Sequence, residues 1–204
     1  MKLIRRFLAV LTILLAAHAS AYADGEYSLL IPPQPTHSGK KIEVLEFFFY
    51  GCIHCYHLHP ELSKWEQTMP KDVVLEFVPV HFNPSWEPMA YTFYALKAMG
   101  DQKRLDDALY NALNRDGLPL YNMDNIADFV AKNGVNRAKF VKYYQSFSVQ
   151  SEVERSGQMT TAYQIEGTPT LVVEGKYVIT GLEPADAIRA LDAVIKKVRQ
   201  ERGR

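Results

Sequence analysis

Cys52 and Cys55, the only two cysteines of the 204-residue chain, are separated by Ile53 and His54. A Cys-x-x-Cys pair can open and close a disulfide through the thiolate of its more reactive cysteine. The pair opens a segment with helical character, directly after a near-continuous apolar run over residues 42–50. Unpaired N–H groups and the helix dipole favour a thiolate at a helix start. We therefore expect Cys52 to be exposed and reactive, and Cys55, one turn inside the helix, to be shielded and to resolve the mixed disulfide.

His54 lies between the two cysteines and can act on the first one. As a cation, or through its ring N–H, it would stabilise the Cys52 thiolate further. A stabilised thiolate stabilises the reduced pair, so the corresponding disulfide passes readily to the thiols of another protein. The helix start and His54 therefore both favour an oxidant.

The cysteine pair has three alternative interpretations: a structural disulfide, a haem attachment site and a metal site. A structural disulfide would close a very short ring, which removes little loop entropy and stabilises little. Covalent haem needs a histidine directly after the second cysteine, where this chain has Tyr56. A metal site would draw on the histidines of the same segment, which are His54, His57 and His59. Because Cys52 and His59 lie about 10 Å apart along a regular helix and zinc ligands bind at about 2 Å, we expect neither a metal nor another cofactor.

Residues 1–23 have the three parts of a secretory signal peptide. A basic start and an apolar run over residues 7–17 precede a small-x-small cleavage site at residues 21–23. The alternative is a membrane anchor, but the run of 11 residues is shorter than the about 18 that a spanning helix needs. We therefore expect cleavage before Asp24 and export to a compartment in which disulfides persist.

The composition is that of a folded globular protein. Hydrophobic residues make up 48% and charged residues 23%, which excludes a disordered chain. Basic and acidic residues number 23 each, so nucleic-acid binding has no electrostatic support. Removal of residues 1–23 takes away three basic and no acidic residues, which leaves a net charge of −3.

The order of predicted elements indicates an α/β fold. After a proline-rich extended arm over residues 24–40, the apolar run 42–50 predicts a buried strand. A helix follows up to Pro70, with Pro60 inside it, and residues 73–80 predict a second strand. This strand, helix and strand should form a parallel pair.

The second half of the chain is expected to be helical before strands return. Residues 85–165 lack strand signals and carry apolar stripes at helical spacing, one of which comprises Phe140, Val141, Tyr144 and Phe147. A hairpin with a tight turn at Gly175 and a helix over residues 184–199 complete the chain. We therefore expect a small mixed sheet flanked by helices and split by a helical insertion.

Two motifs of the chain resemble the thioredoxin superfamily. One is the run Gly51-Cys52-Ile53-His54-Cys55 after a strand, with Pro60 five residues further on, and the other is Gly167-Thr168-Pro169-Thr170 before the hairpin. The insertion, the signal peptide and the x-His dipeptide are similar to the DsbA family of periplasmic thiol:disulfide oxidoreductases, over essentially the whole mature chain. The resemblance implies a thioredoxin-like domain over residues 24–84 and 166–204, with an inserted all-helical domain over residues 85–165.

The resemblance also implies roles for individual residues. Cys52 and Cys55 match the redox pair, and His54 matches the family's histidine. Thr168 and Pro169 match a dipeptide with a cis proline that faces the cysteines and binds extended peptides. Glu46 matches a buried acid that moves protons during exchange, although an ordinary strand-end salt bridge is the alternative.

Three positions depart from the family's pattern. Ile53 stands where a well-known member has proline, and Thr168 where it has valine. A lysine often accompanies the buried acid, but the second strand offers Phe77 and Val78 near that position.

The function implied by the resemblance is that of a monomeric periplasmic dithiol oxidase. Such a protein donates its disulfide to newly exported, unfolded proteins through a mixed disulfide and is reoxidised by a DsbB-like inner-membrane quinone oxidoreductase. The nearest rival is a disulfide isomerase or reductase, because Thr168 before the proline fits some isomerases. Those usually carry a preceding dimerisation domain, for which residues 24–41 are too few. A periplasmic metal-binding module and a substrate-holding chaperone are the further alternatives.

Overall fold

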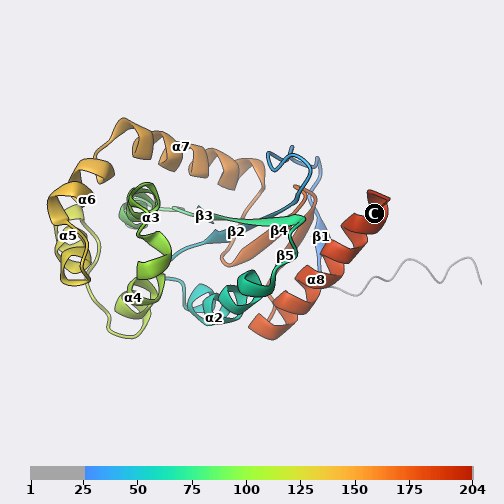
Figure 1. The fold of residues 1–204 in the computed structure, drawn as a ribbon, viewed down its shortest axis with the longest axis horizontal. Coiled ribbons are helices and arrows are strands. Elements are labelled where there is room, and N and C mark those ends of the chain that lie inside the picture. The colour runs from blue at the N-terminus through green and yellow to red at the C-terminus, as the bar shows by residue number, and fades with distance from the viewer. Residues whose placement is uncertain (1–25, 204) are drawn as a thin grey trace, which may run out of the picture.

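The structure is a computed structural model that describes residues 26–203, so the signal peptide expected over residues 1–23 lies outside the described residues. Five strands form one mixed sheet in the order β1-β5-β4-β2-β3. The strands are β1 Ser28–Leu29, β2 Ile42–Phe48, β3 Val73–Pro79, β4 Thr170–Val173 and β5 Tyr177–Thr180. This sheet with its flanking helices confirms the predicted α/β fold (Figure 1).

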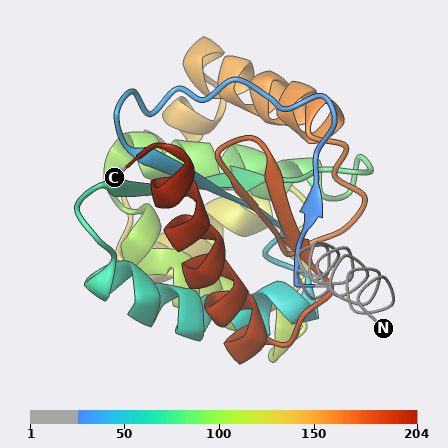
Figure 2. The ribbon, with the colours of Figure 1, turned by 90° about the vertical axis from the view of Figure 1, so that its right-hand side faces the viewer.

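Strand β2 is an interior strand of the sheet, between β4 and β3, and it leads to the cysteines. It runs parallel to β3 and antiparallel to β4, and helix α2 (Ile53–Thr68) connects it to β3. All seven residues of β2 are buried, because helices cover both faces of the sheet. Helices α2 and α8 (Pro184–Glu201) lie on one face, and α7 (Phe147–Ala162) lies on the other (Figures 1 and 2).

The side chains of β2 alternate between the two faces. Val44 packs in a cluster with residues of α2 and α8, whereas Leu45 and Phe47 pack with Tyr163 and its neighbours at the end of α7. Successive strand residues point to opposite faces, so Glu46 shares the face of Val44 and lies beneath α2. A carboxyl group therefore interrupts the apolar side of the strand on the same face as the cysteine helix.

The segment between β3 and β4 is helical. It comprises α3 Glu87–Met99, α4 Gln102–Asn114, α5 Met123–Lys132, α6 Arg137–Tyr144 and α7. These helices share one apolar cluster that also contains Phe48, Tyr50 and Cys55. The core of the helical segment is therefore continuous with the loop that carries the cysteines.

Two details of the helical segment and the arm differ from the sequence expectations. The predicted stripe from Phe140 to Phe147 is wrong as a single helix, because the chain breaks after Tyr144 and Ser146 caps α7 by accepting a hydrogen bond from the Val149 N–H. Phe147 is then the first residue of α7 and is 82% exposed. The arm also contains a strand that was not predicted, since β1 pairs with β5.

No helix among residues 26–203 is long and apolar enough to cross a membrane.

The hairpin turn explains why glycine is required at position 175. Glu174 and Gly175 both have positive φ, of 56° and 59°, and the Lys176 N–H closes the turn on the Val173 carbonyl at 3.1 Å. This two-residue turn is typical of a right-twisted hairpin. A Cβ atom at Gly175 would lie 2.1 Å from the Gln34 carbonyl oxygen, so the arm packs against the turn too closely for any side chain.

Gly175→Ala should therefore lower the free energy of unfolding by clearly more than the about 1 kcal/mol that positive φ alone costs. Gly39→Ala is the matched control, because Gly39 has φ 65° but no atom within 4 Å of the added Cβ. Urea denaturation of both variants measures the difference, and equal losses would contradict the role of the close approach.

Candidate active site around Cys52 and Cys55

Cys52 occupies the N-cap of α2, and three residues separate it from the end of β2. Its backbone is extended, with φ −85° and ψ 120°, and its carbonyl accepts the first helical hydrogen bond from the Tyr56 N–H at 2.9 Å. No side chain caps this helix end. The Cys52 sulfur therefore lies beside unpaired N–H groups, as the sequence predicted.

Gly51 allows an aromatic side chain to lie close to the start of the helix. A Cβ atom at Gly51 would lie 2.6 Å from the ring of Phe49, which stacks on Trp86 with ring centroids 3.9 Å apart. Phe82, 45% exposed, extends the stack. This aromatic cluster was missed from the sequence, although a glycine directly before Cys52 was a signal that a side chain approaches closely.

The two sulfurs have opposite environments, and both are free thiols here. Cys52 is half-buried, and a hydrogen bond from the Cys55 thiol is the largest cause that lowers its pKa, to about 5. A hydrogen bond from the Thr168 side chain and the backbone N–H groups of Cys55 and His54 act in the same direction. Cys55 is fully buried, and burial raises the pKa of its thiol. The predicted shielding of Cys55 is confirmed, whereas Cys52 is only partly exposed rather than fully exposed.

The Thr168–Pro169 loop faces Cys52, and its peptide bond is cis, as the resemblance implied. The Cys52 sulfur lies 3.1 Å from the Thr168 carbonyl oxygen, to which the neutral thiol donates. The Thr170 hydroxyl fixes the loop by donating to the Gly167 carbonyl at 2.8 Å, and its oxygen lies 3.1 Å from the Thr180 hydroxyl. The structure thus brings together residues that are 116 positions apart.

The histidines near the cysteines do not converge. His54 is exposed and stabilises the Cys52 thiolate through its backbone N–H, a route that the sequence interpretation of its ring did not include. His59 turns to helix α4, where its Nε2 lies 2.9 Å from the Asp107 carboxylate. Within residues 26–203, no group of three or more His, Cys, Asp or Glu side chains could hold a metal ion.

Glu46 is a buried acid on β2. It is 1% exposed, and its Oε1 has no hydrogen-bond partner among the described residues. Burial raises its pKa to about 8, and the negative charges of Asp106 and Cys52 add to this effect. The strand-end salt bridge considered for Glu46 is therefore wrong. Phe77 lies directly opposite Glu46 in the register of β2 and β3, so the neighbouring position on β3 carries no cation.

Helix α4 contributes polar residues that sequence reasoning missed. The Tyr50 hydroxyl donates to the Asp106 carboxylate at 2.5 Å, and the Gln102 amide donates to the same carboxylate. The Asn114 amide donates to the Tyr50 carbonyl at 2.7 Å. A signal was present, because Asp106 falls within the apolar stripe of this helix beside Leu105 and Leu109.

The comparisons with known proteins agree with this geometry. The family model of the DSBA-like thioredoxin domain matches residues 55–191. The thiol:disulfide interchange protein DsbA of Bordetella parapertussis is 36% identical over 193 residues, which cover 93% of this chain and 92% of that protein. The DsbA of Pseudomonas aeruginosa is 34% identical over 91% of this chain and 90% of its own length. The chain belongs to the DsbA family.

Solved structures of the DsbA family have the same fold. The crystal structure of Pseudomonas aeruginosa DsbA has a TM-score of 0.86 and 33% identity, and it covers 91% of this chain and 99% of that one. The oxidoreductase DsbA from Xylella fastidiosa has a TM-score of 0.82 and 30% identity, with 90% and 100% of the two chains covered. This DsbA-family chain is therefore a thiol:disulfide oxidoreductase with a thioredoxin-like fold.

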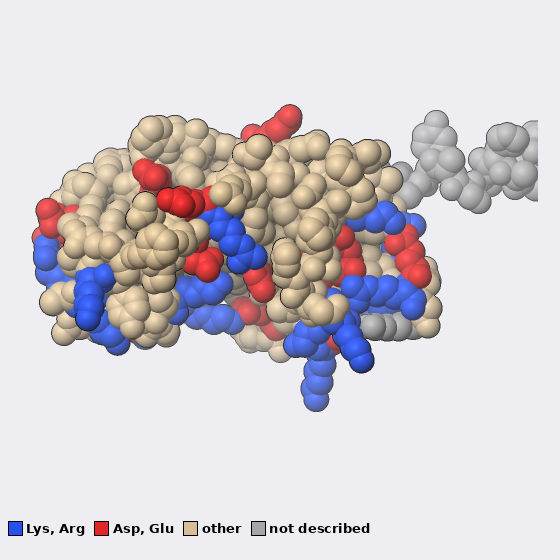
Figure 3. Space-filling view, turned by 90° about the horizontal axis from the view of Figure 1, so that it is seen from above, with Lys and Arg blue, Asp and Glu red and all other residues tan. Residues whose placement is uncertain are grey.

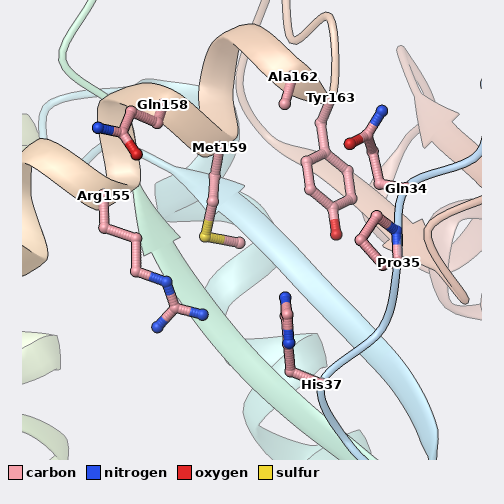
Figure 4. Close-up of a pocket in the computed structure, with 8 residues that line it drawn as sticks. All are labelled: Gln34, Pro35, His37, Arg155, Gln158, Met159, Ala162 and Tyr163. Atoms are coloured by element: carbon pink, nitrogen blue, oxygen red, sulfur yellow. The ribbon is translucent and has the colours of Figure 1, made fainter.

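Other surface features of this DsbA-family chain lie away from the cysteines. A cavity of about 210 Å³ opens between the N-terminal arm and α7, and Figure 4 shows Arg155 and His37 pointing into it. Neither cysteine lines this cavity. On the face shown in Figure 3, acidic and basic side chains are mixed and separated by uncharged areas, so this face offers no continuous charged surface.

The pKa of Cys52 sets a measurable titration for the reduced protein. Thiolate absorbance in the ultraviolet should rise with a midpoint near pH 5, so that at pH 7 about 99% of Cys52 is ionised against about 3% of an ordinary thiol. Thr168→Val keeps the shape of the side chain but removes its hydroxyl, and should move the midpoint upward. A midpoint near the ordinary value of about 8.5 in the unmodified protein would contradict the thiolate environment described above.

Proposed function

We propose that Cys52 and Cys55 form the redox pair of a periplasmic dithiol oxidase, which donates its disulfide to newly exported, unfolded proteins. The observation that supports this most directly is the contrast between the lowered pKa of Cys52 and the raised pKa of Cys55. A protein whose accessible sulfur is stable as a thiolate gains by becoming reduced, so it gives its disulfide away.

The reaction proceeds in two exchanges through a mixed disulfide. A substrate thiolate attacks the Cys52 sulfur, the bond between Cys52 and Cys55 breaks, and Cys55 leaves with the electron pair and takes up a proton. A second substrate thiolate then attacks the substrate sulfur of the mixed disulfide, and Cys52 leaves as a thiolate. Two substrate thiols are oxidised to a disulfide, and the cysteine pair is reduced.

The neighbouring residues have separate roles in this proposal. Glu46 supplies the proton that Cys55 needs, because it is a buried acid with a raised pKa on the strand beneath α2. Thr168 and Pro169 bind the substrate as an extended strand beside Cys52, and the Thr168 hydroxyl also stabilises the departing thiolate. His54 tunes the same thiolate through its position in the first turn of the helix.

The proposal extends to the partners, the location and the domains. The DsbA relatives support reduced exported proteins as substrates, a DsbB-like inner-membrane quinone oxidoreductase as the source of oxidising equivalents, and a periplasmic location. We divide the chain into a thioredoxin-like domain, residues 24–84 and 166–204, and an inserted helical domain, residues 85–165. All strands among the described residues lie in the former, which supports this division.

Cys52→Ser should reduce oxidation of a reduced, unfolded substrate to the uncatalysed rate, because no internal disulfide can form. Cys55→Ser should also be inactive in net oxidation, but its Cys52 should form a mixed disulfide with a disulfide-bonded peptide and hold it. Mass spectrometry distinguishes the two variants. An unchanged oxidation rate in the Cys52 variant, or a mixed disulfide through Cys55, would reject the assignment.

The reduced protein should also melt at a higher temperature than the oxidised one at pH 7. The pKa of Cys52 is lower in the folded protein than in an unfolded chain, so its ionisation stabilises the reduced fold. This contribution is complete above the unfolded value of about 8.5 and is lost as the pH falls toward about 5. Calorimetry with and without reductant should therefore show that the melting temperature of the reduced protein exceeds that of the oxidised protein by an amount that shrinks from pH 8 to pH 5. A higher melting temperature of the oxidised protein would contradict the role as an oxidant.

A further inference from the structure

Asp106 is a buried acid on the inserted helix α4, outside the cysteine pair and its loop. It is 8% exposed, and its carboxylate accepts hydrogen bonds from the Tyr50 hydroxyl and the Gln102 amide. Tyr50 stands two residues before Cys52, and Asn114 of the same helix holds its carbonyl. Helix α4 thus fixes the start of the cysteine loop at two points, and the carboxylate is one of them.

The same carboxylate acts on Glu46. Asp106 is the charged group that most strongly opposes ionisation of Glu46, and Tyr110 of α4, whose ring centroid lies 5.0 Å from that of Tyr50, lies in the field of both acids. Two carboxyl groups in one poorly solvated region do not both ionise near neutral pH. Asp106 has two hydrogen-bond donors, whereas Glu46 Oε1 has none within the described part of the chain. Burial raises the pKa of Asp106 as well, but the hydrogen bonds from Tyr50 and Gln102 oppose this effect. We therefore assign the negative charge to Asp106 and the proton to Glu46.

No ion pair among the described residues compensates the charge of Asp106, although the charge of His59 acts to lower its pKa. On α2 the nearby charged residues are occupied elsewhere, because Lys64 pairs with Glu61 and Glu66 pairs with Lys103 of α4. His59 of α2 lies against Asp107, the exposed neighbour of Asp106. Among residues 26–203, Asp106 itself takes part in no ion pair; its partners are the neutral Tyr50 and Gln102.

We propose that Asp106 is a positioning residue for the thiol chemistry: its negative charge keeps the neighbouring Glu46 carboxyl protonated, so that Glu46 holds the proton that Cys55 takes when the disulfide opens. The proposal rests on the role of Glu46 given above and adds a residue from the inserted helical segment to it. The proton passes from the Glu46 carboxyl to the Cys55 thiolate, and the Glu46 carboxylate is protonated again by water.

A cavity gives that water a route. A space of about 480 Å³ between α2 and α4 is lined by Asp106 and His59 and reaches Phe77 of β3. Phe77 is the residue directly opposite Glu46 in the sheet. The Phe77 side chain, which lines this cavity together with Asp106, is therefore the neighbour of Glu46 that solvent reaches.

The test compares Asp106→Asn with Asp107→Asn. The first variant removes the buried charge and keeps an oxygen that can accept from Tyr50, while the second removes an equal charge one residue away on an exposed side chain. The titration of Glu46 is followed by carbon NMR in the oxidised protein, where neither sulfur carries a charge, with Glu46→Gln identifying the signal. The midpoint should fall by about one pH unit in Asp106→Asn and stay unchanged in Asp107→Asn.

The pH profile of substrate oxidation supplies the second readout. It should move to lower pH in Asp106→Asn by about the same amount as the Glu46 midpoint, and keep its position in Asp107→Asn. If Asp106→Asn does not fold, Tyr50→Phe replaces it, because loss of the donor lets Asp106 keep its proton to higher pH and should shift Glu46 in the same direction by less. An unmoved Glu46 midpoint in an active protein overturns the role of Asp106, whereas an unmodified protein that oxidises no substrate overturns the proposed function instead.

Discussion

The unequal solvation of two sulfur atoms on one helix is the constraint on which the rest of the structure depends. Cys52 lies at the N-cap of α2, where N–H groups and the Thr168 loop stabilise a negative charge, whereas Cys55 faces the core with no access to water. Their separation of one helical turn places one sulfur at the helix end and the other against the core. A disulfide between such sulfurs opens readily in one direction, because only one of the two products is a stable thiolate.

The sheet and the helices maintain this difference. Strand β2 is buried on both faces, so it fixes the point at which the chain leaves the core and α2 begins. The apolar cluster of the helical segment includes Cys55 and Tyr50, so these helices exclude water from the second sulfur. The Thr168–Pro169 loop approaches the first sulfur from the far end of the sequence. Each sulfur therefore owes its environment to segments that are distant in the chain.

This distribution explains what the sequence could and could not predict. The order of strands and helices, and the contrast between Cys52 and Cys55, follow from local periodicity and from the position of the pair at a helix start. The contact of Tyr50 with Asp106 joins residues 56 positions apart. The apolar stripe of α4 indicates that Asp106 is buried, but no local pattern identifies Tyr50 as its partner. The break before Phe147 was missed for a different reason, since a cap formed by Ser146 outweighed an apolar spacing that continued across it.

The residues around Glu46 all favour its protonated form. Phe77 on the adjacent strand is neutral, the Oε1 atom has no donor among the described residues, and Asp106 supplies a negative charge. A cation in place of Phe77 would stabilise the Glu46 carboxylate, and a carboxylate has no proton to give. The neutral Phe77 therefore does not lower the pKa of Glu46, and the anion on α4 raises it. The inserted helices, which shield Cys55, thus also supply the charge that keeps a proton available to it.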